Sequence, residues 1–226
     1  GIWSTYIDPD DTNMASVFSG IVSDLIIVKD EAGSVYWPMF GLNSIGSLTK
    51  GKGYQVKMDA DATLVLEGNL VPYDYNIDLD EGWGITGYLH QDNYNTVDMM
   101  SPVVNDLTIL KDEEGNVYWP MFGLNSIGNM SPGKGYQIKM EAASTLNYPA
   151  SGGARYGDVY VERPVHFEEP ANTGNNMIIG LPLTSWESTP SVGDEIAAYG
   201  EDGELIGSTT FQGDHIALTI WGDDLT

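Results

Sequence analysis

Val35-Tyr36-Trp37-Pro38-Met39-Phe40-Gly41-Leu42-Asn43-Ser44-Ile45-Gly46 recurs without a change at residues 117–128 of this 226-residue chain. The likeness extends outward at a constant offset of 82, since residues 29–58 and 111–140 agree at 23 of 30 positions. Self-similarity at a fixed spacing indicates that one structural unit was duplicated. An asymmetric active site is normally built once, whereas a surface that binds or stacks gains from being copied.

Each copy reads as a β-rich repeat that contains one short helix. In the first copy, apolar residues at helical spacing from Met14 to Val22 predict the helix, with Asp11, Thr12 or Asn13 as its N-cap. Strands are predicted at residues 2–7, 25–28, 35–40, 54–58 and 63–66. Because Pro38 cannot donate a ladder hydrogen bond, the strand that contains it is expected at an edge or a bulge.

The composition changes after the second copy. Residues 149–157 include Ser151-Gly152-Gly153 and predict a flexible linker. Beyond it, strands are expected at residues 158–161, 177–181, 195–199, 205–211 and 216–221. The predicted fold class is mainly β, or α+β: two tandem β-rich repeats, each with one short helix, followed by an all-β, sandwich-like unit. The expected boundaries are 1–70 and 71–148 for the repeats, 149–157 for the linker and 158–226 for the last unit.

Charge is the outstanding bulk property, with 33 acidic against 9 basic side chains and a net charge of −24. Such a field repels phosphates and anionic lipid head groups, so nucleic acid and anionic membrane surfaces are not expected partners. No apolar run approaches the roughly 18 residues that span a bilayer, so no membrane insertion is expected. The chain has no cysteine, which excludes disulfides and thiolate metal sites.

Two interpretations of the acidic residues stay open: a solvated surface, or calcium sites built from carboxylate oxygens. Three clusters are the candidate calcium ligands: Asp8, Asp10 and Asp11; Asp78, Asp80 and Glu81; Asp223 and Asp224. Calcium needs about six to eight oxygen ligands, so each cluster would need backbone or distant help. Calcium is thus the ion these clusters could hold, and no cofactor is required.

Enzymatic function is not indicated by any motif. The run from Gly41 to Gly46 has the spacing G-x-x-S-x-G and not that of a nucleophile elbow, and neither copy has a nearby histidine. The three histidines, His90, His166 and His215, lack metal-ligand spacing. Catalytic residues are therefore not assigned, and the chain is predicted not to be an enzyme.

Aromatic residues make up 11% of the chain, which raises the alternative of carbohydrate binding. Tyr36, Tyr118 and Trp186 are the candidate sugar-binding residues. Neighbouring strand residues point to opposite faces, so Tyr36 and Trp37 cannot both line one platform. Trp37 and its copy Trp119 are expected to be core residues, because a small repeat needs large side chains to bury enough area.

The pattern Tyr-Trp-Pro-x-Phe-Gly-x-Asn-x-Ile-Gly, followed by Gly-x-Gly-Tyr-Gln-x-Lys-Met, resembles a repeat of large secreted or cell-surface proteins of Bacteroidota-type bacteria. Such proteins are often exported by the type IX secretion route. The segments 192–199 and 220–224 resemble a module that is common in the same proteins. The resemblance implies an extracellular or cell-surface location and brings no catalytic residues.

The leading hypothesis is a non-enzymatic structural or adhesive module that self-associates, as a filament or surface-layer subunit, or binds other surface proteins. At an offset of 82, Gly1 aligns with Trp83, so nothing in the first repeat matches Gly82. Open strand edges near both ends would accept another chain's strand. The alternative is a carbohydrate-binding appendage of a secreted enzyme, with a polysaccharide as partner.

Overall fold

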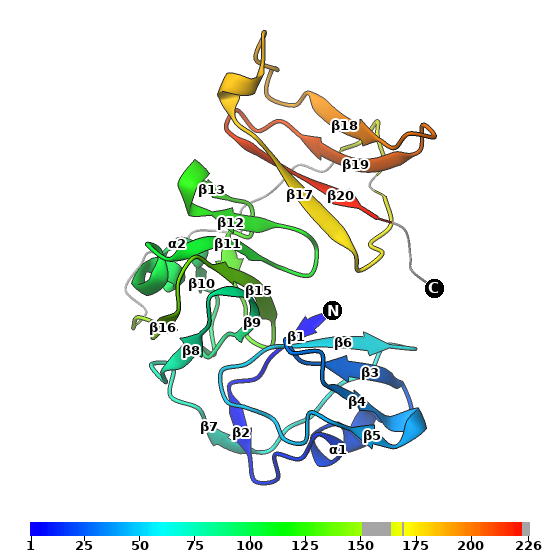
Figure 1. Ribbon diagram of the computed structural model, residues 1–226, viewed down its shortest axis with the longest axis vertical. Coiled ribbons are helices and arrows are strands. Elements are labelled where there is room, and N and C mark those ends of the chain that lie inside the picture. Colours follow the sequence, from blue (N-terminus) through cyan, green and yellow to red (C-terminus); the bar gives the residue numbers. More distant parts are fainter. Residues whose placement is uncertain (151–163, 169, 223–226) are drawn as a thin grey trace.

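The chain forms a mainly β structure, as predicted, and we describe it as two repeats and a C-terminal β unit. The computed structural model describes residues 1–150, 164–168 and 170–222. Repeat 1 (residues 1–70) lies at the bottom of Figure 1, and repeat 2 (residues 71–148) lies beside it. The C-terminal β unit (the described residues from 164 to 222) lies over repeat 2 at the top. The linker expected at 149–157 and the strand expected at 158–161 fall largely or wholly outside the described residues.

The two repeats contain the same five-stranded antiparallel sheet. Its order is β1-β6-β3-β4-β5 in repeat 1 and β9-β15-β11-β12-β13 in repeat 2. The strands of repeat 1 are β1 (Ile2–Trp3), β2 (Ile7–Pro9), β3 (Leu25–Lys29), β4 (Val35–Trp37), β5 (Leu42–Asn43), β6 (Tyr54–Met58) and β7 (Gly68–Leu70). The strands of repeat 2 are β8 (Ile77–Leu79), β9 (Gly82–Gly87), β10 (Tyr94–Asn95), β11 (Leu107–Lys111), β12 (Val117–Trp119), β13 (Leu124–Asn125), β14 (Asn129–Met130), β15 (Gly135–Met140) and β16 (Ser144–Leu146).

The helices are shorter than the apolar periodicity predicts. Repeat 1 has α1 (Met14–Val17) and then a 3₁₀ turn, η1 (Ser19–Ile21), and repeat 2 has α2 (Thr96–Met100) and η3 (Ser101–Val103). Asn13 is the N-cap of α1, and its side chain accepts a hydrogen bond from the Ala15 amide at 2.9 Å. The helical face continues through a 3₁₀ turn because the chain must bend back into the next strand.

The strand predicted through Phe40 ends earlier, at Trp37. Pro38 starts the 3₁₀ turn η2 (Pro38–Phe40), which Gly41 closes in the left-handed conformation at φ 62°. The same turn, η4 (Pro120–Phe122), follows Trp119. Because the strand stops here, Tyr36 lies inside the repeat and Trp37 is partly exposed, which corrects the expectation that Trp37 and Trp119 are core residues.

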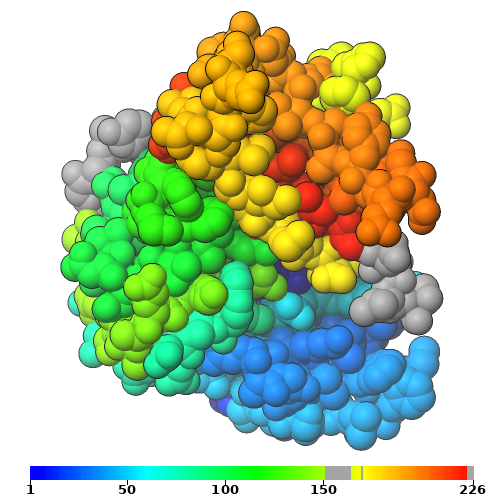
Figure 2. Space-filling view, turned by 45° about the horizontal axis from the view of Figure 1, so that its top comes forward, coloured from blue at the N-terminus to red at the C-terminus, as the bar shows by residue number. Residues whose placement is uncertain are grey.

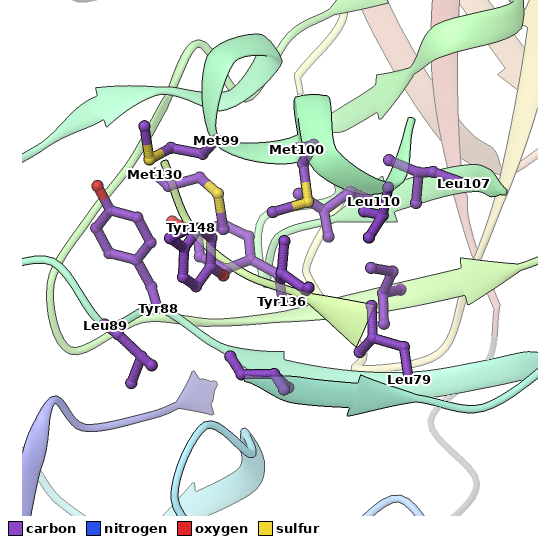
Figure 3. Close-up of a cluster of buried hydrophobic side chains, with 14 of the residues drawn as sticks. Leu79, Tyr88, Leu89, Met99, Met100, Leu107, Leu110, Met130, Tyr136 and Tyr148 are labelled. Carbon is purple, nitrogen blue, oxygen red and sulfur yellow. The ribbon is translucent and has the colours of Figure 1, made fainter. Parts of the chain in front are cut away.

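Repeat 2 has the larger core. Its buried cluster includes Met99, Met100, Leu110, Met130, Tyr136 and Tyr148 (Figure 3). Three members come from the segment that joins the repeats: Val71, Ile77 and Leu79. Ile77 and Leu79 belong to β8, which pairs antiparallel with β16. The smaller cluster of repeat 1 includes Met14, Phe18, Val28 and Tyr54.

The predicted final strand of repeat 1 at residues 63–66 is not formed. Repeat 1 instead ends in β7, which pairs with β2. The segment of repeat 2 that corresponds to residues 62–64 is β16, and it is a strand because β8 lies beside it. The difference shows that this segment forms a strand only where another strand pairs with it.

The repeats meet through a reciprocal contact between the first strand of each sheet and the Gly-Lys-Gly segment of the other. Trp3 of β1 forms a β-bridge with Lys134, and Thr86 of β9 forms one with Lys52. The Ser4 amide donates to the Gly133 carbonyl at 3.1 Å, and the Gly87 amide donates to the Gly51 carbonyl at 2.8 Å. The two contacts are equivalent, so the repeats are related by an approximate two-fold arrangement.

A glutamate and a lysine extend each half of this contact. Lys52 Nζ pairs with Glu31 at 2.6 Å, and the other oxygen of Glu31 accepts the Ile85 amide of repeat 2 at 3.0 Å. Lys134 likewise pairs with Glu113, which accepts the Ile2 amide of repeat 1 at 3.0 Å. The conserved side chains of the duplicated hairpins therefore serve the junction between repeats.

The first strands match at an offset of 83 and not 82. Ile2 lies opposite Gln55 in repeat 1, and Ile85 lies opposite Gln137 in repeat 2. Gly1 therefore corresponds to Gly84, which corrects the alignment with Trp83. The helix caps Asn13 and Asn95 return to the offset of 82, so repeat 2 has one residue fewer between strand and helix.

The C-terminal β unit consists of two antiparallel strand pairs around a small core. Strand β17 (Asn176–Leu181) pairs with β20 (Ile216–Trp221), and β18 (Glu195–Tyr199) pairs with β19 (Leu205–Thr210). The 3₁₀ turn η5 (Leu183–Ser185) follows β17. Phe211, Ile216 and Leu218 are buried between the pairs. Across the described residues, no helix is long and apolar enough to cross a membrane.

Glycine at position 53 is required by the junction between repeats. A Cβ there would lie 2.6 Å from Ile85 Cγ2 and 2.8 Å from the Thr86 carbonyl oxygen. We expect Gly53→Ala to lower the free energy of unfolding by about 1–3 kcal/mol, the usual cost of overpacking, in a denaturant titration. Gly20→Ala is the matched control, because open space surrounds Gly20 in the described structure. Equal effects of the two substitutions would contradict the proposed close approach.

Candidate functional site

The three candidate sugar-binding aromatics do not share a surface. Tyr36 and Tyr118 are only 7% and 5% exposed and belong to the cores of the two repeats. Trp186 is partly buried against the core of the C-terminal β unit. Each of the three rings therefore contributes to the packing of a different unit.

The candidate calcium ligands have other local roles where the structure describes them. Asp8 forms an ion pair with Lys50 at 2.7 Å, and Asp11 accepts the Ser16 hydroxyl at 2.6 Å. Asp78 accepts the Thr145 hydroxyl at 3.0 Å, while Asp10, Asp80 and Glu81 are exposed. Asp223 and Asp224 lie outside the described residues. Within the described part of the chain, no three His, Asp or Glu side chains converge as metal ligands.

The surface that stands out is made by the duplicated Trp-Pro-Met-Phe turn, which we call the platform. In repeat 2 the Trp119 and Phe122 rings meet edge to face at a centroid distance of 4.7 Å. In repeat 1 Trp37 and Phe40 meet in the same way at 4.6 Å. The two platforms have the same sequence and the same ring geometry.

The platform of repeat 2 carries the C-terminal β unit. Gly180 of β17 lies against Trp119, where a Cβ would come within 3.1 Å of the indole ring. Phe122 meets His215 with ring centroids 6.4 Å apart. Figure 2 shows the yellow atoms of the β17 region seated on the green atoms of repeat 2.

Hydrogen bonds from the neighbouring hairpin complete this contact. Thr219 Oγ1 donates to the Gly115 carbonyl at 2.9 Å. Lys111 Nζ donates to the Asn176 side chain. Asn172 Nδ2 donates to the Glu113 carbonyl at 2.8 Å. The β unit is therefore held by polar contacts around an aromatic centre.

Contact with the β unit removes water from the hairpin beneath it. Lys111 is only 7% exposed, and this burial lowers the pKa of its ammonium group. Burial also raises the pKa of the Asp112 carboxyl, against the lowering effect of hydrogen bonds from Asn116. Both shifts disfavour the charged forms, as expected at a desolvated interface.

The platform of repeat 1 is exposed. Phe40 and Leu42 are 61% and 50% exposed, whereas Phe122 and Leu124 in repeat 2 are partly buried. Met39 and its counterpart Met121 are both exposed, at 83% and 76%. The residues of repeat 2 named above as contacts of the β unit each have an identical counterpart in repeat 1: Lys29, Glu31, Gly33, Trp37 and Phe40. Within the described residues, repeat 1 therefore carries the same surface with no β unit on it.

Sequence reasoning treated this stretch as a repeated core and did not recognise a platform. The signal that could have revealed it is the strict identity of residues 35–46 and 117–128. Cores tolerate swaps between apolar side chains of similar volume, as Val56 and Ile138 illustrate. Identity that extends to Phe40 and to Phe122, which meets His215 of the β unit, indicates a shared contact surface.

A second feature is an apolar cleft of about 290 Å³ beside His90, lined by Leu70, Val71, Pro72, Tyr73, Leu89, His90 and Gln91. The His90 ring stacks on Tyr73 at 4.8 Å, and its Nε2 lies 3.1 Å from the Pro149 carbonyl oxygen. Burial lowers the pKa of His90, although the Pro149 carbonyl and Asp92 act in the opposite direction. The lining residues include no carboxylate or hydroxyl-bearing nucleophile other than the Tyr73 phenol, so the cleft offers packing and no evident acid–base pair.

No family model, curated protein sequence or solved structure matches this chain.

The two platform tryptophans should differ in their contribution to stability. We expect Trp119→Ala to cost up to about 3 kcal/mol, the lower end of the range for deleting a buried aromatic, because the residue is only partly buried although its indole nitrogen is covered and its ring packs on Gly180. Trp37→Ala should cost clearly less in the same chemical denaturation experiment. A larger loss for Trp37→Ala would contradict the assignment of the two platforms as covered and uncovered.

His90 should make the protein less stable in mild acid. Its folded-state pKa lies below the ordinary value of 6.5, so the unfolded chain binds the proton more readily and stability falls as the pH drops through about 6.5. The melting temperature of the parent should therefore fall more than that of His90→Phe between pH 8 and pH 5. The exposed His166→Gln serves as the control, and it should follow the parent.

Proposed function

We propose that the chain is a non-enzymatic structural or adhesive module of the extracellular space or cell surface, whose repeats bind β units through their platforms. One observation carries the proposal. The aromatic surface that holds the C-terminal β unit on repeat 2 is reproduced without change on repeat 1 and is exposed there. A large exposed apolar patch with defined polar surroundings is typical of a protein-binding site.

The partner we propose for the open platform is the C-terminal β unit of a second copy. Gly180 would lie on Trp37, His215 would meet Phe40, and Thr219 would donate to the Gly33 carbonyl, as their equivalents do in repeat 2. Since the same residues would be used, the β unit of one copy can leave its own repeat 2 and bind repeat 1 of another. Such an exchange forms about as many contacts as it breaks. Because it joins two copies, a high protein concentration favours it.

The exchange predicts a linear assembly. The platform and the β unit are different surfaces, so each contact between copies is heterologous, and each chain can give its β unit to one neighbour and accept a β unit on repeat 1 from another. The net charge of −24 opposes association between copies. Salt should therefore promote it by screening the repulsion.

Phe40→Asp should abolish self-association of the full-length chain. A carboxylate in the aromatic centre of the interface would be desolvated without a partner, and the side chain is exposed, so folding should be kept. Sedimentation velocity at increasing protein concentration and physiological salt measures the effect. Val97→Asp, on the partly exposed helix α2, is the matched control and should associate like the parent. A parent that stays monomeric throughout, or a Phe40→Asp variant that still associates, would refute the proposed interface.

A further inference from the structure

The core of repeat 2 is covered on one side by β8, a strand that does not belong to the five-stranded sheet. Strand β8 pairs with β16, and its Ile77 and Leu79 side chains are 2% and 5% exposed. Leu79 lies in the apolar cluster together with Leu107 and Leu110 (Figure 3). Between the two aliphatic residues, Asp78 accepts the Thr145 hydroxyl of β16 at 3.0 Å.

Repeat 1 has the acceptor segment for such a strand, but no described strand pairs with it. Residues 62–64 correspond to β16, and Thr63 and Leu64 are the counterparts of Thr145 and Leu146. Thr63 is exposed, and Leu64 is partly buried. The hydroxyl and the leucine that hold β8 in repeat 2 are therefore both present in repeat 1.

The apolar side chains around this segment are only partly covered. Their counterparts in repeat 2 are almost completely buried, at 1% for Ile138, 2% for Met140, 0% for Leu146 and 0% for Tyr148. The corresponding residues of repeat 1 pack on its core but remain partly exposed: Val56, Met58, Leu64 and Leu66. The difference marks the surface that β8 covers in repeat 2.

The junction between repeats shows the same asymmetry on its other side. Ile77 of β8 fills the space beside Gly51, where a Cβ would lie 2.6 Å from its side chain. The counterpart Gly133 has no described atom within 4 Å of that position. The Lys52 side chain beside β8 is 25% exposed and lies 3.4 Å from the Asp78 carbonyl oxygen, whereas the Lys134 side chain is 50% exposed. Gly133 and Lys134 thus border the space in repeat 1 that corresponds to the space filled by β8 in repeat 2.

We propose that repeat 1 is a β-strand acceptor, whose occupant is a second strand of the β8 type, in which an aspartate stands between two aliphatic residues. The strand would pair antiparallel with residues 62–64 and place two aliphatic side chains, at positions i and i+2, on Val56, Met58, Leu64 and Leu66. An aspartate between them would accept the Thr63 hydroxyl, and Lys134 would reach a backbone carbonyl. Strand addition of this kind takes affinity from main-chain hydrogen bonds and specificity from alternate side chains.

This proposal does not depend on the platform, because the two surfaces share no residue. The chain's own β8 is already paired with β16, so the strand that fills repeat 1 is a second strand of the same type. The acidic character of the β8 segment, with Asp78, Asp80 and Glu81, makes salt favourable for binding to this acidic chain.

The direct test uses the full chain and a synthetic peptide with the sequence of residues 74–81. We expect saturable binding by titration calorimetry and slower hydrogen exchange of the amides in residues 61–66. A control peptide with Ile77→Ser and Leu79→Ser should bind about tenfold or more weakly, because both buried side chains are lost. Thr63→Val in the protein should also weaken binding, whereas Thr145→Val should leave the slower exchange at residues 61–66 in place.

A tethered version keeps the test decisive if the free peptide binds weakly. Residues 71–83 placed ahead of Gly1 reproduce the order of repeat 2 and bring the strand to about millimolar effective concentration. The tethered chain should show slow exchange at residues 61–66, and the same tether with both serines should not. Equal exchange in the two tethered chains, or slowing confined to residues 144–146, would overturn the proposal. Peptide binding by the Phe40→Asp variant separates this acceptor from the platform, because it should be unchanged.

Discussion

The structure depends on a close approach of two backbones at the junction of the repeats. Gly53 and Gly135 leave no room for a side chain, since a Cβ on Gly135 would lie 2.9 Å from Ile2 Cγ2. Around this approach, Glu31 and Glu113 each join a lysine of their own repeat to an amide of the other. The Gly-Lys-Gly segment is thus explained by a contact between repeats.

The reciprocal junction makes the two repeats equivalent, but their surroundings differ. Repeat 2 receives β8 on one side and the C-terminal β unit on the other, and its core is nearly completely buried. Repeat 1 has the same acceptor segment and the same platform, with Leu64 partly buried and Phe40 exposed. The surfaces that are buried in repeat 2 and exposed in the nearly identical repeat 1 are therefore the ones where a partner could bind. This difference between the repeats is the physical basis of the proposed function.

Much of the fold could be predicted from the sequence, because the duplication shows which residues act together. The strand content, the short helices and the boundaries of β17, β18 and β20 follow from alternation and turn chemistry. Alternation along the strand shows that Tyr36 and Trp37 point to opposite faces of the sheet, but not which face is buried. That depends on what packs on each face, and Pro38 also ends the strand earlier than predicted. The strand predicted at residues 63–66 failed for a related reason: a strand needs a neighbour, and that neighbour is distant in sequence. The candidate site was missed because identical residues were interpreted as core.

The most direct measurement compares hydrogen exchange of residues 35–46 with that of residues 117–128 in the full chain. The two segments have the same sequence, so their intrinsic exchange rates are equal and any difference reports their surroundings. If the platform of repeat 1 is an open docking site, residues 35–46 exchange faster than residues 117–128 in dilute solution. As protein concentration and salt increase, exchange slows at residues 35–46 and quickens at residues 117–128, because the β unit moves from repeat 2 of one copy to repeat 1 of another. Equal exchange at every concentration, or a difference that concentration does not change, would contradict the account.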